Sequence, residues 1–196
     1  MGKSIVLASA SPRRTEILKA NGIKAEIIPA EVDESLPEGT KPDIACMYNA
    51  MKKALWVRDR LKEVPGPEDA LIIGADTIVY DGRILGKPKD PQDSFDTLSS
   101  LRNATHTVMT GVAVADALSH ETRVFCERTY VSFGDYSDDE IRAYIATGEP
   151  ADKAGSYAVQ GLWSRHVTSV DGDYYNVIGL PWDRLRTELL SLGADI

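Results

Sequence analysis

Short apolar runs alternate with helical patterns in the first third of the chain. The runs at residues 4–9 (SIVLAS) and 25–30 (AEIIPA) have the length and composition of strands. Between them, residues 12–22 have a helical pattern that closes on an Asn-Gly pair, a common helix stop. Residues 42–61 carry apolar side chains at an approximately helical period. The chain is therefore predicted to begin as strand, helix, strand and helix.

The rest of the chain favours longer strands. After a break at residues 64–69 (VPGPED), the run ALIIGADTIVY is the most hydrophobic strand candidate, and the DGR that follows it signals a hairpin into ILGKP. Two long strand patterns are then joined by a polar turn. We therefore predict an α/β or α+β fold with a mixed sheet and not a doubly wound parallel one. The expected elements are strands at 70–80, 105–118 and 123–136 and helices at 94–101, 137–148 and 181–192.

The amino-acid composition and net charge exclude some classes of binding partner. The chain has 196 residues, of which 43% are hydrophobic and 27% are charged, with a formal net charge of −8. Nucleic-acid and anionic-membrane surfaces need clustered excess cations, so we expect neither kind of partner. Cys46 and Cys126 are far apart in sequence and lack metal-ligand spacing, which favours a reducing, cytoplasmic setting. The start of the chain lacks a signal-peptide pattern, and no apolar run approaches the length of a membrane span.

Two arginines stand where the first strand pattern gives way to a helix. Ser11 suits the N-cap and Pro12 the first helical position, which puts Arg13 and Arg14 in the first turn. Each cation there is unfavourable by a few tenths to about 1 kcal/mol, because the helix dipole is positive at this end. A bound anion would reverse the sign, and the hydroxyls of Ser9 and Ser11 flank the same turn. The pattern favours a phosphate-binding turn.

A surface ion pair is the alternative interpretation of this turn. Glu16 lies three residues after Arg13 and could neutralise it on the helix surface, a pairing worth only about 0.2–0.5 kcal/mol. Such a pair would leave the two flanking hydroxyls unexplained.

Asp76 ends the apolar part of the strand candidate at 70–80. A carboxylate there is expensive to bury unless it is paired or binds a cation, and α/β proteins commonly place metal and catalytic groups at strand ends. Lys87 and Lys153 also lie near glycines and prolines, and with the two arginines they could build a polyphosphate site completed by Mg²⁺. Two plainer interpretations stay open: Asp76 caps a turn with Thr77, and each lysine is simply solvated.

Other chemistries lack their signatures. The three histidines have no metal-ligand spacing, and the chain has neither a Walker A loop nor a dinucleotide fingerprint. The serines lack an obvious base. The residues alone therefore point to metal-assisted hydrolysis of a phosphoanhydride and leave the nucleotide and the bond open.

Five stretches together resemble one known family. LASASPRRTEIL, EVDES, IGADTIVYDGRILGKPKD, GEPADKAGSYAVQG and GDYYNVIGLP are similar, in this order, to the Maf family of nucleoside triphosphate pyrophosphatases, also called septum-formation-inhibitor-like proteins. The resemblance runs from about Ile5 to Leu190 and implies a single domain over residues 1–196. It also implies an elongated α/β fold like that of the inosine triphosphate pyrophosphatases. In that fold a mixed sheet with flanking helices forms two lobes, and the active site lies in the cleft between them.

The resemblance assigns catalytic and metal-binding roles to four residues. Asp76, in the GADT motif, falls on the family's proton-acceptor position, so the resemblance implies this role for it. Glu34, in EVDES, falls on an acidic position that helps to hold a divalent cation, Mg²⁺ or Mn²⁺, together with Asp76. Lys53 and Lys87 fall on the family's lysine positions. The implied reaction splits a nucleoside triphosphate into the monophosphate and pyrophosphate.

The resemblance also implies how the substrate is bound. Ser9 and Arg13 match positions that contact phosphates. Three positions separate the subfamilies, and here they hold Arg13, Thr77 and Gln160, which is similar to the group that acts on dTTP and UTP. Trp163 stands where many members have a small residue, close to the expected base pocket. We expect it to pack against the rim and not to stack on the base.

Two functions are compatible with this resemblance. The first is a pyrimidine nucleoside triphosphate pyrophosphatase that acts as a homodimer in the cytoplasm. The second is a nucleotide-binding regulator of cell division that does not depend on turnover. Both need the same pocket, but the full set of carboxylate and lysine positions favours catalysis, because a regulator could dispense with the base.

Overall fold

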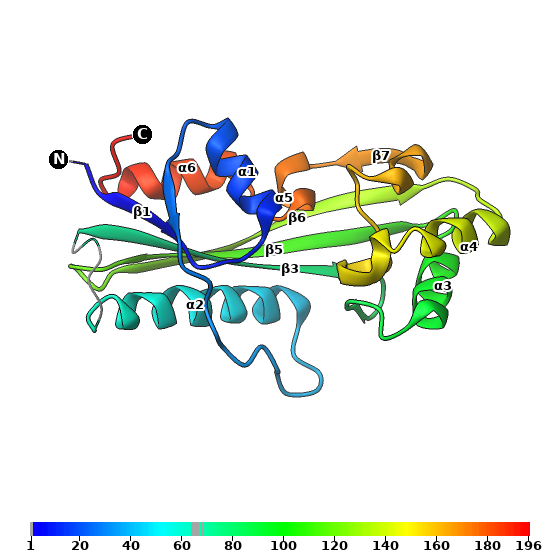
Figure 1. Cartoon of the computed structure of the whole chain (residues 1–196), viewed down its shortest axis with the longest axis horizontal. Helices are drawn as coiled ribbons and strands as arrows, with labels where there is room; N and C mark the ends of the chain where they lie inside the picture. Colours follow the sequence, from blue (N-terminus) through cyan, green and yellow to red (C-terminus); the bar gives the residue numbers. More distant parts are fainter. Residues whose placement is uncertain (1, 64–66, 68) are drawn as a thin grey trace. The chain divides into compact units, whose positions relative to one another are not determined.

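The computed structural model describes residues 2–63, 67 and 69–196 (Figure 1). Most of the break expected at 64–69 lies outside the described residues. Within the described part of the chain, no helix is long and apolar enough to cross a membrane. The strands are β1 (Ser4–Leu7), β2 (Ala25–Ile27), β3 (Ala70–Tyr80), β4 (Ile84–Leu85), β5 (Thr105–Asp116), β6 (Thr122–Phe133) and β7 (Val167–Asp171). The helices are α1 (Pro12–Ala20), α2 (Pro42–Arg60), α3 (Pro91–Ser100), α4 (Asp138–Ala146), α5 (Tyr174–Ile178), α6 (Trp182–Ser191) and the 3₁₀ helices η1 (Glu149–Asp152), η2 (Ala154–Ser156) and η3 (Leu162–His166).

The described residues form one seven-stranded mixed sheet. Its strand order is β2-β1-β3-β5-β6-β7, and β4 pairs with β3. β1 runs parallel to both β2 and β3, whereas β4 is antiparallel to β3 and β7 is antiparallel to β6. The parallel pair β1 and β2 needs a crossover connection, which α1 supplies. The mixed sheet predicted from the sequence is confirmed.

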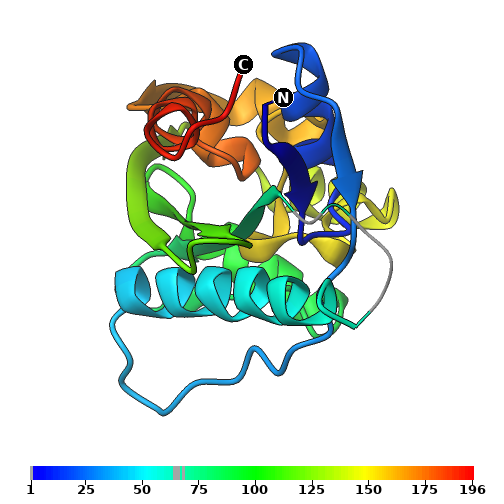
Figure 2. The same ribbon diagram turned by 90° about the vertical axis from the view of Figure 1, so that its left-hand side faces the viewer.

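Two compact units make up the chain. The first unit comprises Met1–Asp76, Thr110–Glu127 and Gly179–Ile196, and the second comprises Thr77–Met109 and Arg128–Ile178. In the first unit, α2 covers one face of the strands, while α1 and α6 lie on the opposite face (Figures 1 and 2).

Glycines allow α2 to lie very close to the strands of the first unit. A Cβ added at Gly74 of β3 would stand 2.1 Å from the carbonyl oxygen of Ala50, and one at Gly111 of β5 would stand 2.3 Å from the carbonyl carbon of Cys46. Any side chain at either glycine would therefore push the helix backbone away from the sheet. The core around this contact contains Val6, Ala8, Ala50, Ala54, Val57, Ala70, Ile72, Ala113 and Ala115.

Aromatic side chains fill the second unit, in which α3 packs against α4. Nε2 of His106 lies 2.7 Å from the hydroxyl of Tyr157, and the rings of Phe133 and Tyr157 meet edge to face with centroids 4.8 Å apart. Burial lowers the pKa of His106 to about 4 and raises the pKa of Tyr157 well above its usual value. Both groups are therefore uncharged at neutral pH.

Most of the predicted elements are confirmed, but several strands end two or three residues earlier than expected, at Leu7, Ile27, Asp116 and Phe133, and β7 and α5 were not predicted. The helix expected at 94–101 begins earlier, at Pro91, because Asp90 is its N-cap and the Asp90 carboxylate accepts a hydrogen bond from the backbone N–H of Asp93. The chain after α4 folds into three short 3₁₀ helices, which the apolar pattern did not indicate. The predicted capping box of Ser137 and Glu140 is present at the start of α4.

Candidate active site

Asp76 lies inside β3, beside the point where the neighbouring strand β1 ends. The parallel pairing of β1 with β3 stops at Leu7 and Ile73, after which the chain leaves β1 for the first turn of α1. Three residues further along β3, the side chain of Asp76 is 14% exposed. The predicted strand-end position is therefore wrong in one respect: β3 continues to Tyr80, and it is the adjacent strand that ends.

Two side chains of α2 hold the carboxylate of Asp76. Nζ of Lys53 donates to Oδ1 at 2.9 Å, and Nδ2 of Asn49 donates to Oδ2 at 3.3 Å. The two residues are four apart and so project from one face of the helix, with only 8% and 5% of their surfaces exposed. The interpretation in which Asp76 merely caps a turn with Thr77 is wrong, because Asp76 is part of a strand and α2 binds both of its oxygens.

The same face of α2 also fixes the loop that carries Glu34. Nζ of Lys53 lies 3.1 Å from Oε1 of Glu34, and Nδ2 of Asn49 donates to the backbone carbonyl of Glu34 at 3.2 Å. We call Glu34, Asn49, Lys53 and Asp76 the Asp76 cluster. The sequence interpretation missed Asn49. Its spacing of four residues from Lys53 is the one signal that could have found it.

Asn49 also carries an unsatisfied acceptor. Its Oδ1 is buried and accepts no hydrogen bond from the residues that the structure describes. A buried polar atom without a partner costs about 1–3 kcal/mol. Such an atom on a side chain that contacts the Asp76 carboxylate marks a place where a bound ligand or cation would be favourable.

Arg14, in the first turn of α1, is turned into the protein. Its Nε donates to the backbone carbonyl of Gly179 at 2.9 Å, and its Nη1 donates to Oγ of Ser9 at 2.9 Å. Burial lowers the pKa of the Arg14 guanidinium, and the nearby charge of Asp76 acts in the opposite direction. Arg14 therefore joins the start of α1 to the chain just before α6.

Arg13 is in the same turn but has no comparable contacts. Ser11 is the N-cap and Pro12 the first helical residue, as predicted, and no acidic residue occupies the first turn. In the part of the chain that the structure describes, the Arg13 guanidinium has no hydrogen-bond or ion-pair partner, and the pair with Glu16 is not formed. Its charge remains available to an anion at the helix N-terminus.

The other predicted site residues belong to the second unit. Thr77 follows Asp76 in β3 and is half-buried, Lys87 is exposed between β4 and α3, and Gln160 is exposed in the turn before η3. Neither Lys87 nor Gln160 makes a side-chain hydrogen bond to another described residue. Lys153 is not simply solvated, because its Nζ donates to the backbone carbonyl of Glu149 at 3.0 Å.

Trp163 is completely buried in the second unit. Its ring stacks on that of Tyr144 with centroids 4.7 Å apart and lies 4.3 Å from the ring of His166. The expectation that Trp163 packs and does not stack on a base is therefore confirmed.

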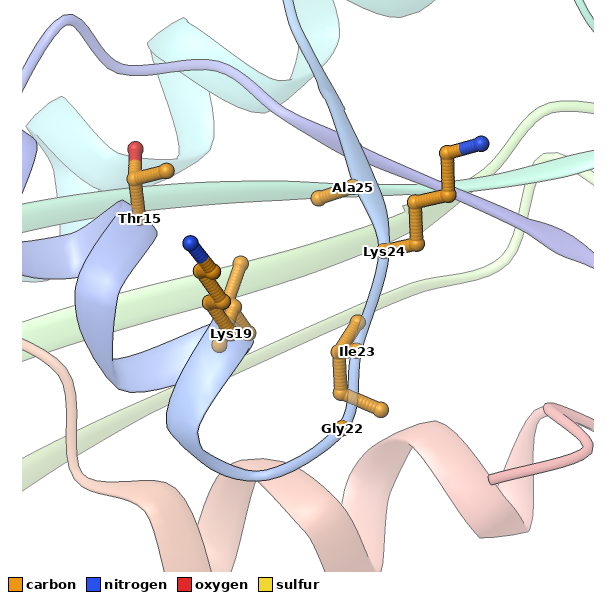
Figure 3. Close-up of a pocket in the computed structure, with 7 residues that line it drawn as sticks. Thr15, Lys19, Gly22, Ile23, Lys24 and Ala25 are labelled. Atoms are coloured by element: carbon orange, nitrogen blue, oxygen red, sulfur yellow. The ribbon is translucent and has the colours of Figure 1, made fainter.

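A pocket of about 330 Å³ opens between α1 and β2 in the first unit. Figure 3 shows Lys19 projecting from α1 and Lys24 from the segment that leads into β2, with Ile23 between them. The pocket is bounded by Thr15, Leu18, Lys19, Gly22, Ile23, Lys24 and Ala25. None of these is a predicted site residue, so the pocket is separate from the Asp76 cluster.

Comparisons with known proteins agree on one family. The family profile described as "Maf-like protein" matches residues 4–192. A protein of Caldicellulosiruptor saccharolyticus named dTTP/UTP pyrophosphatase is 47% identical over 99% of this chain and 97% of its own length. A protein of the same name from Pelotomaculum thermopropionicum is 46% identical over 99% of both chains, and one from Bacillus cereus is 43% identical over 99% of this chain and 92% of its own. The profile match and these identities over nearly the whole length show that the chain belongs to the Maf-like protein family.

Proposed function

We propose that the chain is a nucleoside triphosphate pyrophosphatase that hydrolyses dTTP and UTP to the monophosphate and pyrophosphate. The names of the similar proteins from Caldicellulosiruptor saccharolyticus and Pelotomaculum thermopropionicum support this activity and substrate class. The observation in this chain that carries the proposal is the Asp76 cluster, in which α2 holds a carboxylate from both sides. A site that only binds a polyphosphate would be weakened by two carboxylates, whereas hydrolysis uses them as base and metal ligands.

The proposed reaction is attack of water on the α-phosphorus. Asp76 accepts a proton from the water, and the bond between the α-phosphorus and the oxygen that bridges to the β-phosphorus breaks. Pyrophosphate then leaves. A positioned general base typically accelerates such a reaction by a factor of about 10²–10⁴. Lys53 orients the Asp76 carboxylate through its 2.9 Å hydrogen bond, and Arg13 and Lys87 would neutralise charge that develops on the pyrophosphate.

The Asp76 cluster has the donor atoms that Mg²⁺ or Mn²⁺ prefers. The carboxylates of Glu34 and Asp76 converge on Nζ of Lys53 at 3.1 and 2.9 Å, and Oδ1 of Asn49 adds an unsatisfied amide oxygen. Among the described residues there is no group of three or more His, Cys, Asp and Glu side chains that could hold a metal. Glu34 and Asp76 are the residues that would hold a divalent cation here. Once bound, the cation would polarise the phosphate that is attacked.

Gln160 is proposed to read the pyrimidine. Uracil and thymine present an N–H donor flanked by two carbonyl acceptors, and a glutamine amide offers one acceptor and one donor to match them. The exposure of Gln160 and its lack of a side-chain partner among the described residues support this role. The alternative, in which Gln160 braces its own loop through backbone contacts, lacks such contacts in the described chain. Thr77, next to Asp76, is assigned to the same substrate-binding group.

The assembly and location of the protein are part of the proposal. The similarity to the family supports a homodimer. The net charge of −8 supports the absence of nucleic acid and anionic membranes as partners. The cysteine content supports a cytoplasmic location.

A nucleotide screen tests the proposed activity. The purified full chain would be incubated with each common nucleoside triphosphate and Mg²⁺ or Mn²⁺, and pyrophosphate and orthophosphate would be measured separately. We expect pyrophosphate without orthophosphate, fastest with dTTP and UTP, and loss of the product when the metal is chelated. Release of orthophosphate alone would place the cleavage at another bond.

The same screen separates the enzyme from a regulator of cell division. Isothermal titration with dTTP in the presence of Mg²⁺ would run in parallel with the product assay. Tight binding without release of either product would overturn the enzyme and support the regulator. Turnover of dTTP and UTP would overturn a role that depends on binding alone.

A further inference from the structure

Cys46 and Cys126 meet in the first unit although 80 residues separate them in the sequence. Cys46 is on α2 and completely buried, Cys126 is on β6 and half-buried, and their sulfur atoms are 3.6 Å apart. Each sulfur also lies within hydrogen-bonding distance of a backbone carbonyl, that of Asp43 at 3.2 Å and that of Glu127 at 3.6 Å. The sequence interpretation treated the two cysteines as unrelated, so this juxtaposition is new.

The packing of α2 explains why the sulfurs are so close. The helix backbone at Cys46 rests directly on Gly111 of β5, and β5 is the neighbour of β6 in the sheet. A disulfide has an S–S distance of about 2.05 Å, so the two sulfurs need to approach by about 1.5 Å. Formation of the bond therefore requires the two side chains to rotate toward each other.

We propose that Cys46 and Cys126 are a dithiol site that hydrogen peroxide converts into a reversible disulfide, and that this bond fixes α2 to β6. The sulfur of Cys126 attacks peroxide, the O–O bond breaks, and a sulfenic acid and one water form. The sulfur of Cys46 then attacks the sulfur of Cys126, and hydroxide leaves with the Cys46 proton as a second water. Two thiols and one peroxide thus give one disulfide and two waters. A dithiol reductant reverses the change.

The environments of the two thiols set the order of these steps. The hydrogen bond with Cys126 and then burial raise the pKa of Cys46, so this thiol stays protonated and is shielded from solvent. Cys126 is partly exposed and therefore meets the oxidant first. A neighbouring thiol at 3.6 Å captures the sulfenic acid before further oxidation.

The disulfide would anchor the helix that builds the Asp76 cluster. On α2, Cys46 precedes Asn49 by about one turn and Lys53 by about two turns. A disulfide between residues that lie 80 positions apart closes a long loop in the unfolded chain. Closing this loop restricts the unfolded chain and so stabilises the folded state. We expect the melting temperature of the oxidised chain to exceed that of the reduced chain by about 5–10 °C.

Mass spectrometry of the intact chain tests the site directly. The reduced full chain would be treated with a small excess of hydrogen peroxide, unfolded, and alkylated with N-ethylmaleimide. Because the chain has two cysteines, a monomer that has lost two protons and takes up no label must contain the Cys46–Cys126 bond. We expect this species to form at least about tenfold faster in the native chain than in guanidinium, and to take up two labels after treatment with dithiothreitol.

Two matched variants and a melting curve complete the test. Cys46→Ser should leave Cys126 to oxidise beyond the sulfenic acid, whereas Cys126→Ser should protect Cys46 from oxidation, and neither should gain thermal stability from peroxide. A disulfide-linked dimer, a sulfinic acid on Cys126 in the wild type, or an unchanged melting temperature after oxidation would overturn the proposal. Neither measurement involves nucleotide, so failure of the disulfide proposal is distinguishable from failure of the proposed function.

Discussion

The two units bury polar groups in opposite ways. The Asp76 cluster of the first unit keeps opposite charges in contact, with Nζ of Lys53 2.9 Å from Asp76 and 3.1 Å from Glu34. The ring cluster of the second unit, formed by His106, Phe133, Tyr136, Tyr144, Tyr157, Trp163 and His166, keeps its polar groups neutral. There, burial lowers the pKa of His106 and raises the pKa of Tyr157.

The difference separates groups suited to chemistry from groups suited to packing. Buried charges cost several kcal/mol unless they are paired. The Asp76 cluster retains two of them, on Lys53 and Asp76, together with an unsatisfied amide oxygen on Asn49, which is typical of a functional site. Neutral rings packed edge to face mainly stabilise the fold. We therefore expect substitutions in the Asp76 cluster to reduce turnover. Substitutions in the ring cluster should instead change the free energy of unfolding and its dependence on pH.

Apart from substitution of Asp76 itself, Lys53→Met should have the largest effect among the variants that sharpen this comparison. It removes the ammonium that orients Asp76, so we expect kcat/KM for dTTP to fall by about 10²–10³, as for loss of one preorganised donor. The free energy of unfolding should fall by about 3 kcal/mol or less, because Glu34 is 54% exposed and the pair is only partly buried. Steady-state kinetics and urea unfolding measure the two effects.

Lys52→Met is the matched control on the same helix. Lys52 donates to the backbone carbonyl of Asp33 and lies over the ring of Tyr48, without contact to Asp76. Its kcat/KM should stay within about threefold of the wild type. Equal losses in the two variants would mean that the net charge of α2 matters and the pairing with Asp76 does not.

In the ring cluster, His106 should make the free energy of unfolding depend on pH. Its pKa is about 4 in the folded protein against an ordinary value of 6.5, so between these pH values the unfolded chain binds more protons. The free energy of unfolding should therefore fall as the pH drops from 6.5 to 4, by about 3 kcal/mol from this group. Urea unfolding at several pH values should show a smaller fall for His106→Gln, and an identical pH dependence would contradict the assignment.

Arg13 and Arg14 show the same contrast between a functional and a structural group within a single helical turn. Arg13→Ala should leave the melting temperature unchanged or slightly higher, because it removes from a helix N-terminus a cation that has no partner among the described residues. The variant should bind an α,β-methylene analogue of dTTP more weakly by about 1.5–3 kcal/mol, the worth of a charge-assisted hydrogen bond. Arg14→Ala should instead lower the melting temperature, since it removes the bonds to Gly179 and Ser9. An equal thermal shift with the analogue in wild type and Arg13→Ala would refute the phosphate contact.

Gln160→Glu should have the smallest effect and the most selective one. A carboxylate can accept from the ring N–H of uracil or thymine but opposes a carbonyl with its second oxygen. We expect kcat/KM for dTTP and UTP to fall by at least about tenfold, equivalent to about 1.4 kcal/mol, while that for GTP falls less or rises. Both nucleotide classes should be measured on one preparation. An equal loss of kcat/KM for both nucleotide classes would show that Gln160 does not read the base.

Local patterns were enough to predict most elements and the outline of the site. The apolar run from Ala70 to Tyr80, the Asn-Gly stop after α1 and the capping box at Ser137 each depend on neighbouring residues, and each prediction is confirmed. The 3₁₀ helices after α4 were not predicted because left-handed turns at Gly148 and Gly155 determine them, and no apolar period marks such turns.

The contacts within the site depended on tertiary structure. The local helix pattern could not distinguish Arg13 from Arg14, and only the resemblance to the family singled out Arg13. The carbonyl of Gly179 and the hydroxyl of Ser9 decide which guanidinium is bound by the protein. Asn49 went unnoticed because an asparagine inside a helix has no chemical signature until Asp76 lies opposite it. The meeting of Cys46 and Cys126 was hidden for the same reason, because it requires α2 to pack on the sheet.

The central claim is that the charge held in the Asp76 cluster drives turnover. Asp76→Asn keeps the size of the side chain and removes its negative charge, so the most direct test is pyrophosphate release from dTTP by this variant, compared with wild type at equal folded concentration. The account predicts a kcat lower by about 10²–10⁴, with a melting curve that still shows a cooperative, folded protein. A variant that retains more than half of the wild-type turnover would contradict it.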